Sequence, residues 1–358
     1  MLQGQRLVDS IARSVHRAFG GKRKLVDLQD VYHGRVHCAT LDDGTRLAAK
    51  TVSSATRFEA EVVALRALAA AGAPVPRLHD ADAMSQLLVM EWCPGKSLLE
   101  ACRNGRPLNS CALTCVVDGI ADLQLAVRHM PAAPPATAAE PHSESYVHQV
   151  ARNAASLLFD ADRAAHRRGS SGGSRTGPGM MPGTCPELAE GVRELATELS
   201  RRLSALPMSA GPLDAHPGNV IIRDGEVRFL DFALWGPGRP EAGLVEYLGI
   251  APSAGAELEA PMEAYVARVA PRHGVRGFRE SLWGHWLAYQ LGLARALRDL
   301  AAGRGPSDPT FGWLAATALG ERQDDHTRLL DATIRRIKQK PPYGDAAQQL
   351  HRILLRYL

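Results

Sequence analysis

Residues 212–238 read PLDAHPGNVIIRDGEVRFLDFALWGPG, and this stretch decides the fold. Apolar residues flank Asp224-Gly225 on both sides, which predicts a strand over Val220–Arg223 and a returning strand over Val227–Leu230. Both central residues of a type I′ turn need a positive φ, and Asp-Gly adopts such angles readily. The stretch therefore predicts a β-hairpin with a tight loop, 214–219, in front of it.

Polar side chains stand at both ends of this hairpin. Asp214 and Asn219 precede the first strand, and Asp231 follows the second. Because the two ends of a two-stranded ribbon lie together, we expect these three side chains to converge. Two carboxylates and an amide in one place suit phosphoryl transfer, in which one group orients a hydroxyl and two hold Mg²⁺ on the phosphates.

These residues resemble the aminoglycoside phosphotransferase and choline kinase-like family, whose fold is that of the protein kinases. The family's catalytic loop reads H-G-D-x-H-P-G-N and is followed by a hairpin and an apolar-apolar-Asp motif. The matching residues are Asp214, His216, Pro217, Gly218 and Asn219 in the loop, and Leu230, Asp231 and Phe232 after the hairpin. The chain departs from the pattern at Pro212 and Leu213, and Ala233 stands where many kinases carry the glycine of D-F-G.

The resemblance implies an α+β, bilobal, protein-kinase-like fold. A small antiparallel β-sheet with one key helix forms the N-terminal, nucleotide-binding lobe, residues 1–92, which includes an opening helix. A larger, mainly α-helical lobe, residues 93–358, carries catalysis and acceptor binding. Within it we expect helices over 142–158 and 187–206 and a mobile insertion at about 160–186, whose core, 167–186, is rich in Gly, Ser and Pro.

The N-terminal lobe has the expected elements in order. Apolar residues at helical spacing predict an amphipathic opening helix that Gly20-Gly21 ends. Strand-like runs follow at 25–32, 35–41 and 46–52, with turn residues between them. The usual G-x-G-x-x-G is absent from the first turn; Gly34 is the candidate phosphate contact, and a plain hairpin turn is the alternative.

Lys50 follows Leu47-Ala48-Ala49, as the ATP-binding lysine follows V-A-I in kinases. The next segment, 56–71, is rich in helix-forming residues. Glu61 stands where the family's helix glutamate pairs with the lysine, and Glu59, on a different face, is the competing candidate. We prefer Glu61 on the family's spacing, which implies that Lys50 contacts the α- and β-phosphates and that Glu61 fixes Lys50.

Residues 86–92 read QLLVMEW and precede Pro94-Gly95, which resembles the hinge of the family. The resemblance implies that backbone groups of Glu91 and Cys93 face the adenine. An ordinary exit from strand to loop is the alternative.

Composition excludes several classes of protein. Of 358 residues, 22% are charged and the net charge is +4. This mild charge does not indicate the basic surface that a nucleic-acid partner would need. The six cysteines form no C-x-x-C pair, so neither a zinc site nor a disulfide framework is indicated. No apolar run is long enough to span a bilayer, and the opening segment lacks the pattern of a signal peptide. We therefore expect a cytoplasmic protein without a membrane partner.

The family resemblance implies an ATP-dependent O-phosphotransferase with Asp214 as the catalytic residue, Asn219 and Asp231 as Mg²⁺ ligands, and a hydroxylated small molecule as acceptor. An Asx-turn that caps the loop is the alternative role for Asp214. The acceptor could be aminoglycoside-like, another antibiotic or a biosynthetic intermediate, because acidic and basic residues are interleaved in the last third of the chain. A catalytically impaired, nucleotide-binding scaffold is the second hypothesis, prompted by Pro212, Ala233 and the missing Gly-rich loop. A protein kinase is the third, and the absence of an A-P-E signature disfavours it.

Overall fold

The computed structural model describes residues 2–103, 108–126, 209–212, 215–233, 235–238, 240–251 and 258–272, together with Thr197 and scattered residues between 278 and 314. Asp214, the expected insertion, the helix predicted over 142–158 and nearly all of the one predicted over 187–206 lie outside these residues. The chain forms two compact units, of which the first comprises Met1–Pro141, Met208–Tyr247 and Ala256–Val269. The expected lobe boundary after Trp92 stays a prediction.

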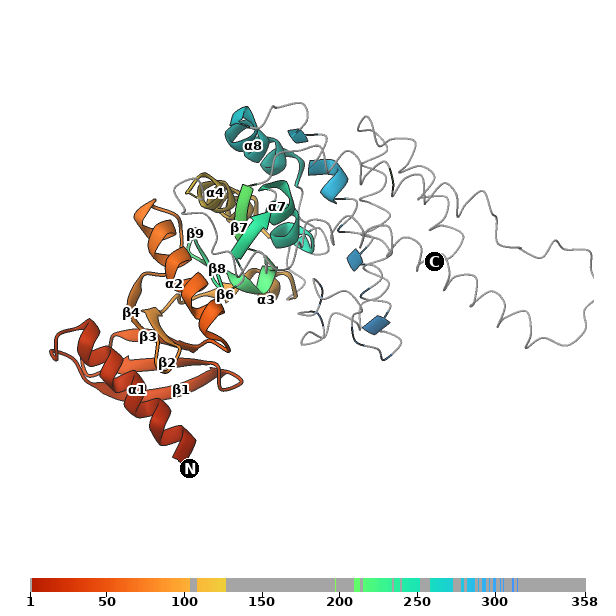
Figure 1. Cartoon of the computed structure of the whole chain (residues 1–358). Helices are drawn as coiled ribbons and strands as arrows, with labels where there is room; N and C mark the ends of the chain where they lie inside the picture. Colours follow the sequence, from red (N-terminus) through yellow and green to blue (C-terminus); the bar gives the residue numbers. More distant parts are fainter. Residues whose placement is uncertain are drawn as a thin grey trace, which may run out of the picture. The chain divides into compact units, whose positions relative to one another are not determined.

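An antiparallel five-stranded sheet in the order β1-β2-β3-β5-β4 forms the N-terminal part of this unit (Figure 1). Its strands are β1 (Leu25–Tyr32), β2 (Val36–Leu41), β3 (Arg46–Thr51), β4 (Leu78–Asp82) and β5 (Leu87–Glu91). The predicted strands at 25–32, 35–41 and 46–52 are confirmed to within one residue at each end. Strand β4 was not predicted, because its sequence LHDAD lacks an apolar alternation.

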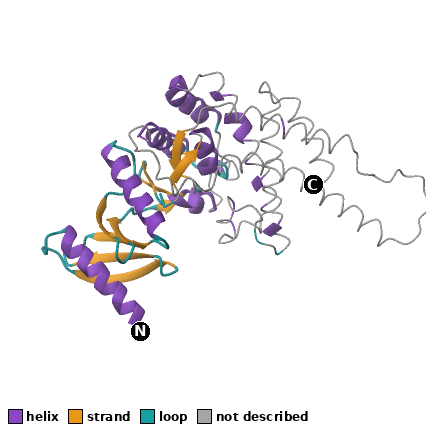
Figure 2. Cartoon of the chain, viewed as in Figure 1, coloured by secondary structure: helices purple, strands orange, loops and turns teal. Residues whose placement is uncertain are grey.

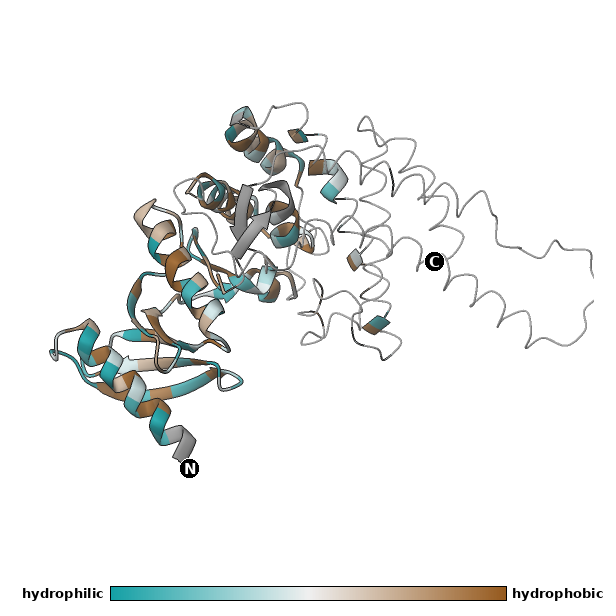
Figure 3. Ribbon diagram, in the orientation of Figure 1, coloured by the Kyte–Doolittle hydropathy of each residue, from teal (hydrophilic) through white to brown (hydrophobic). Residues whose placement is uncertain are grey.

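Helix α1 (Leu2–Ala18) covers one face of the sheet. Its Ile11 and Val15 are buried in a core cluster that includes Leu47 of β3 and Val89 of β5. Figure 3 shows apolar and polar bands along α1, as expected of an amphipathic helix. The guanidinium of Arg17 near its C-terminal end lies 2.8 Å from a carboxylate oxygen of Asp80 in β4.

Helix α2 (Ala55–Ala70) begins at Ser54, whose hydroxyl accepts a hydrogen bond from the Arg57 amide at 3.3 Å. Successive residues of a strand point to opposite faces of a sheet. Ala49 belongs to the core cluster under α1, and its neighbour Lys50 reaches Glu61 of α2. The sheet therefore presents one face to α1 and the other to α2.

After β5 the chain forms β6 (Lys96–Ser97) and α3 (Leu98–Arg103). Ser97 and Glu100 form a capping box at the start of α3: the Ser97 amide donates to Glu100 Oε2 at 2.8 Å and the Glu100 amide donates to Ser97 Oγ at 3.1 Å. Helix α4 (Ser110–Ala126) follows.

The predicted hairpin is present as β8 (Val220–Arg223) and β9 (Glu226–Phe229), and β6 pairs with β8 to make a three-stranded sheet (Figure 2). Asp224 and Gly225 have φ angles of 50° and 84°, which confirms the predicted turn chemistry. Helix α4 packs against this hairpin at Gly119, where an added Cβ would overlap Val227 and lie 3.0 Å from the Phe229 ring.

Two further strands and two further helices flank the hairpin in the sequence. Strands β7 (Ser209–Pro212) and β10 (Trp235–Gly238) pair in antiparallel register, with Trp235 opposite Pro212. Helices α7 (Pro240–Leu248) and α8 (Glu259–Val269) follow. The guanidinium of Arg268 in α8 joins α4 by ion pairs at 3.0 Å to Asp118 and 2.7 Å to Asp122. In the described part of the chain, every helix is too short or too polar to cross a bilayer.

Candidate active site

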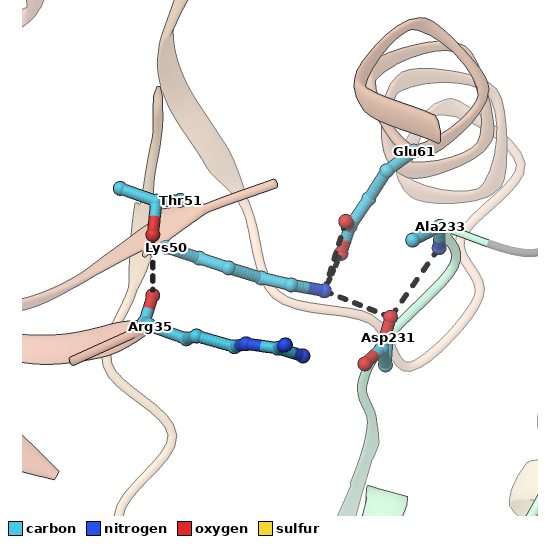
Figure 4. Close-up of polar contacts among 6 residues, drawn as sticks. All are labelled: Arg35, Lys50, Thr51, Glu61, Asp231 and Ala233. Atoms are coloured by element: carbon cyan, nitrogen blue, oxygen red, sulfur yellow. Dashed lines mark hydrogen bonds and ion pairs between the residues drawn. The ribbon is translucent and has the colours of Figure 1, made fainter. Parts of the chain in front are cut away.

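The ammonium group of Lys50 is the centre of the site. Its Nζ lies 2.7 Å from Glu61 Oε1, 2.8 Å from Glu61 Oε2 and 2.8 Å from Asp231 Oδ1 (Figure 4). The Lys50 side chain is 14% exposed and that of Glu61 is 1% exposed, so water weakens their attraction little. The structure thus brings together three of the site residues expected from the sequence.

Helix α2 decides which glutamate reaches Lys50. Glu61 lies on the buried face of the helix with Phe58, Leu65 and Leu68, whereas Glu59 is exposed. Of the two candidates, Glu61 is therefore the one in contact with the lysine.

Asp231 adopts an unusual backbone conformation. Its φ is 63°, in the left-handed region that residues other than glycine rarely enter. One carboxylate oxygen, Oδ1, accepts from Lys50 and also from the Ala233 amide at 3.4 Å. The next residue, Phe232, is fully buried and anchors the segment. The strained backbone therefore turns the Asp231 carboxylate toward the lysine.

Asn219 lies at the same end of the hairpin as Asp231. The Leu230 amide donates to the Asn219 carbonyl at 2.8 Å, just beyond the last paired residues of β8 and β9. Asn219 ends a short 3₁₀ turn, Pro217–Asn219, that His216 caps by accepting the Gly218 amide on Nδ1 at 3.1 Å. This contact gives His216 a structural role in the loop.

The ionisable groups around Lys50 shift one another's pKa values. Burial disfavours the charged ammonium, but Glu61 and Asp231 outweigh burial and raise the pKa of Lys50. Burial opposes ionisation of Asp231 too, yet the charge and hydrogen bond of Lys50 lower the pKa of that carboxyl. For the more deeply buried Glu61, burial outweighs Lys50 and raises the pKa. Asp231 is thus the more firmly ionised of the two carboxylates and the better partner for a cation.

The donors of Asn219 and Asp231 fit Mg²⁺. Both side chains offer hard oxygen atoms, and the lowered pKa of Asp231 keeps its carboxylate charged. Within the described ranges no three His, Cys, Asp or Glu side chains are grouped as a metal site. Mg²⁺ usually keeps several waters and takes one or two protein carboxylates together with substrate phosphates, so this small donor set suits it.

The expected hinge leaves the sheet at the end of β5. The Glu91 amide donates to the Arg77 carbonyl at 2.8 Å, and the Glu91 carboxylate accepts from the Arg77 amide at 3.1 Å. Gly95 has a φ of 143°, and an added Cβ there would lie 2.6 Å from the Ile222 carbonyl oxygen, so only glycine fits this approach to β8. Burial, reinforced by the Glu91 charge, raises the pKa of the Cys93 thiol to about 11.

Gly34 occupies a two-residue turn with His33, with φ angles of 73° and 45°. Its amide donates to both carboxylate oxygens of Asp30, each at 2.9 Å. Asp30 was not among the residues expected at this site, because its contact with an amide four residues later depends on the geometry of the turn.

The chain matches the family described as "Phosphotransferase enzyme family" over residues 35–278. No curated protein matches it. Among solved structures, an aminoglycoside phosphotransferase from Alicyclobacillus acidocaldarius subsp. acidocaldarius DSM 446 is similar at 16% identity and a TM-score of 0.55, over 88% of this chain and 93% of that one.

Two further structures resemble the chain. A choline/ethanolamine kinase family protein from Mesorhizobium loti is 14% identical, with a TM-score of 0.52 over 97% of this chain and 99% of that one. A mutant aminoglycoside 2'-phosphotransferase-IIIa, in complex with GDP, is 11% identical, with a TM-score of 0.50 over 92% and 96%. These similarities confirm the protein-kinase-like fold that the sequence predicts.

Proposed function

This chain belongs to the phosphotransferase enzyme family, and we propose that it transfers the γ-phosphate of ATP to a hydroxyl group of a small molecule. The observation that carries the proposal is the contact of one ammonium, Lys50, with two carboxylates, Glu61 and Asp231, at 2.7–2.8 Å. This arrangement links the sheet to the end of the hairpin. With both carboxyl groups ionised, the three side chains together carry one more negative than positive charge. A site of that charge favours Mg²⁺ with a nucleotide.

Each residue has a distinct role in the proposed reaction. Lys50 contacts the α- and β-phosphates, and Glu61 holds its ammonium in place. Asn219 and Asp231 hold Mg²⁺, which when bound neutralises charge on the phosphate oxygens. The main chain of Glu91 and Cys93 contacts the adenine.

Asp214 faces the acceptor. It orients the hydroxyl and accepts its proton while the hydroxyl oxygen bonds to the γ-phosphorus and the bond to ADP breaks. The acceptor is a hydroxylated small molecule, because the similar structures are named for aminoglycosides and for choline or ethanolamine, which all carry hydroxyl groups.

A nucleotide-binding scaffold without transferase activity is the second candidate. The contact of the Gly34 amide with Asp30 favours it, because that amide is already bonded and the turn has no other glycine. The two candidates differ in turnover and not in nucleotide binding.

The test is phosphate transfer from γ-labelled ATP to a panel of aminoglycosides, macrolides, amino alcohols and sugars. Wild-type protein is compared with Asp214→Ala, and nucleotide affinity is measured for both. We expect transfer to at least one compound by the wild type, and its loss in the variant with ATP affinity nearly unchanged. Tight ATP binding without transfer to any compound would favour the scaffold, and an equal loss of both properties in the variant would contradict the role of Asp214.

A further inference from the structure

Three main-chain amides in the turn between β1 and β2, those of Tyr32, Gly34 and Arg35, are already bonded within the protein. The Arg35 amide donates to the Tyr32 carbonyl at 2.8 Å and closes the turn. The amides of Tyr32 and Gly34 donate to the Asp30 carboxylate, at 3.1 and 2.9 Å. An anionic side chain therefore already holds the donors that a Gly-rich loop would offer to phosphates.

Arg35 follows this turn and is held firmly by its backbone. Its carbonyl accepts from the Thr51 amide at 2.9 Å and from the Thr51 hydroxyl at 3.3 Å. The next residue, Val36, lies directly opposite Lys50 in the ladder of β2 and β3. The base of the Arg35 side chain is thus fixed close to the strand position of the lysine.

The side chain of Arg35 extends in the same direction as that of Lys50. Figure 4 shows both side chains running toward Asp231, with the guanidinium below the ammonium in this view. Arg35 is exposed, and among the described residues no carboxylate lies within ion-pair distance of its guanidinium. Its charge is therefore available to a ligand that enters beside Lys50.

We propose that Arg35 binds the outer phosphates of the nucleotide, and that this side chain replaces the main-chain contacts of a Gly-rich loop. A guanidinium offers several donors in one plane and matches the oxygens of a phosphate group. Lys50 is held by two carboxylates, so the exposed Arg35 supplies the second positive charge that a triphosphate needs. This inference rests on the proposed function, because it requires that a nucleotide binds at Lys50.

The test is calorimetric titration of ATP, AMP and adenosine into the wild type, Arg35→Ala and Arg35→Lys. Arg66→Ala is the control, since Arg66 is an exposed arginine on α2. We expect Arg35→Ala to bind ATP roughly tenfold more weakly and to bind AMP and adenosine like the wild type, since one charge-assisted contact is lost. Arg35→Lys should recover part of the ATP affinity, and Arg66→Ala should bind all three compounds normally.

The other outcomes distinguish failure of this inference from failure of the proposed function. If the wild type binds ATP and Arg35→Ala binds it as tightly, the inference is wrong and the proposed function stands. If the wild type binds neither ATP nor adenosine, both fail. Equally weakened binding of ATP, AMP and adenosine to Arg35→Ala would also overturn the inference, because the lost contact would then not be one with the outer phosphates. Thermal unfolding of each variant shows whether its fold is kept.

Discussion

Lys50 Nζ and Asp231 Oδ1 lie 2.8 Å apart, although the two residues are separated by 181 positions in the chain. Lys50 belongs to β3, the middle strand of the N-terminal sheet. Asp231 comes directly after the hairpin, and its own backbone has a strained φ of 63°. The contact joins the two structures at the place where the phosphates of a nucleotide are expected to lie.

Removal of the Asp231 carboxylate should weaken nucleotide binding through the metal. For Asp231→Ala we expect an at least tenfold loss of ATP affinity in the presence of Mg²⁺ and a much smaller loss in its absence. Titration of Mg²⁺ against a fluorescent ATP analogue measures this dependence. Asp224→Ala is the control, because Asp224 is an exposed turn residue. An unchanged Mg²⁺ dependence in Asp231→Ala would remove this residue from the metal site.

Lys50 and Glu61 should act as one unit in nucleotide binding. Lys50→Met should reduce ATP affinity more than Glu61→Gln, because the amide of glutamine still accepts a hydrogen bond from the ammonium. In the double variant the loss should equal that of Lys50→Met, since Glu61 then has no ammonium to position. Affinities of the two single variants and the double variant give the coupling. Losses that multiply would mean that the two residues act independently.

The stability of Lys50→Met should depend on pH. Removal of the lysine leaves Glu61, which is 1% exposed, without its nearest positive charge, at a cost of about 3–5 kcal/mol when the carboxylate is ionised. The folded-state pKa of Glu61 is already raised by burial, and without Lys50 it rises further. A carboxyl group whose pKa is higher in the folded than in the unfolded state stabilises the fold at a pH below the unfolded-state pKa. This contribution is lost as the pH rises through the folded-state pKa.

Urea unfolding of Lys50→Met and the wild type at pH 5 and pH 8 checks this expectation. The difference in free energy of unfolding should be larger at pH 8 than at pH 5. Arg66→Met should show no such difference. A Lys50→Met penalty that is equal at both pH values would mean that Glu61 does not take up a proton.

Gly119 should be intolerant of a larger side chain. In Gly119→Ala the new methyl group overlaps Val227 and crowds the ring of Phe229, so we expect a loss of about 1–3 kcal/mol despite the better helix propensity of alanine. Thermal or urea unfolding measures it, with Thr114→Ala on the exposed face of α4 as the control. Unchanged stability of Gly119→Ala would show that α4 and the hairpin are less closely packed than described.

Cys93 should be slow to alkylate. With a pKa of about 11, only about one thousandth of this thiol is ionised at pH 8, and the thiolate is the reactive form. Iodoacetamide labelling followed by peptide mass spectrometry should find Cys111, an exposed cysteine, modified well before Cys93. Saturating ATP should slow Cys93 further and leave Cys111 unaffected. If ATP protected neither residue, the placement of the adenine at this hinge would be wrong.

Local chemistry made part of the site predictable from sequence. The Asp224-Gly225 turn follows from two adjacent residues, and their positive φ angles are present. The resemblance to the family pointed to Glu61 as the partner of Lys50, although the sequence alone could not exclude Glu59, and the structure has the contact with Glu61.

Contacts between distant segments were not predictable in the same way. No local pattern links Lys50 to Asp231, because only the folded chain brings the sheet to the hairpin. Strands β7 and β10 read SAGP and WGPG, which lack any apolar alternation, so their pairing depends on tertiary context. The contact of Asp30 with the Gly34 amide depends on the turn geometry and was missed for that reason.

The packing of α1 on the sheet also affects the order of folding. Ile11 and Val15 belong to the same core cluster as Val89 of β5, which comes much later in the chain than α1. The hairpins of β1, β2 and β3 need only local contacts, but α1 cannot complete its core until β5 has joined the sheet. We therefore expect the apolar face of the sheet to be covered only after β5 has joined it, and until then this face is the surface of the sheet most prone to aggregation.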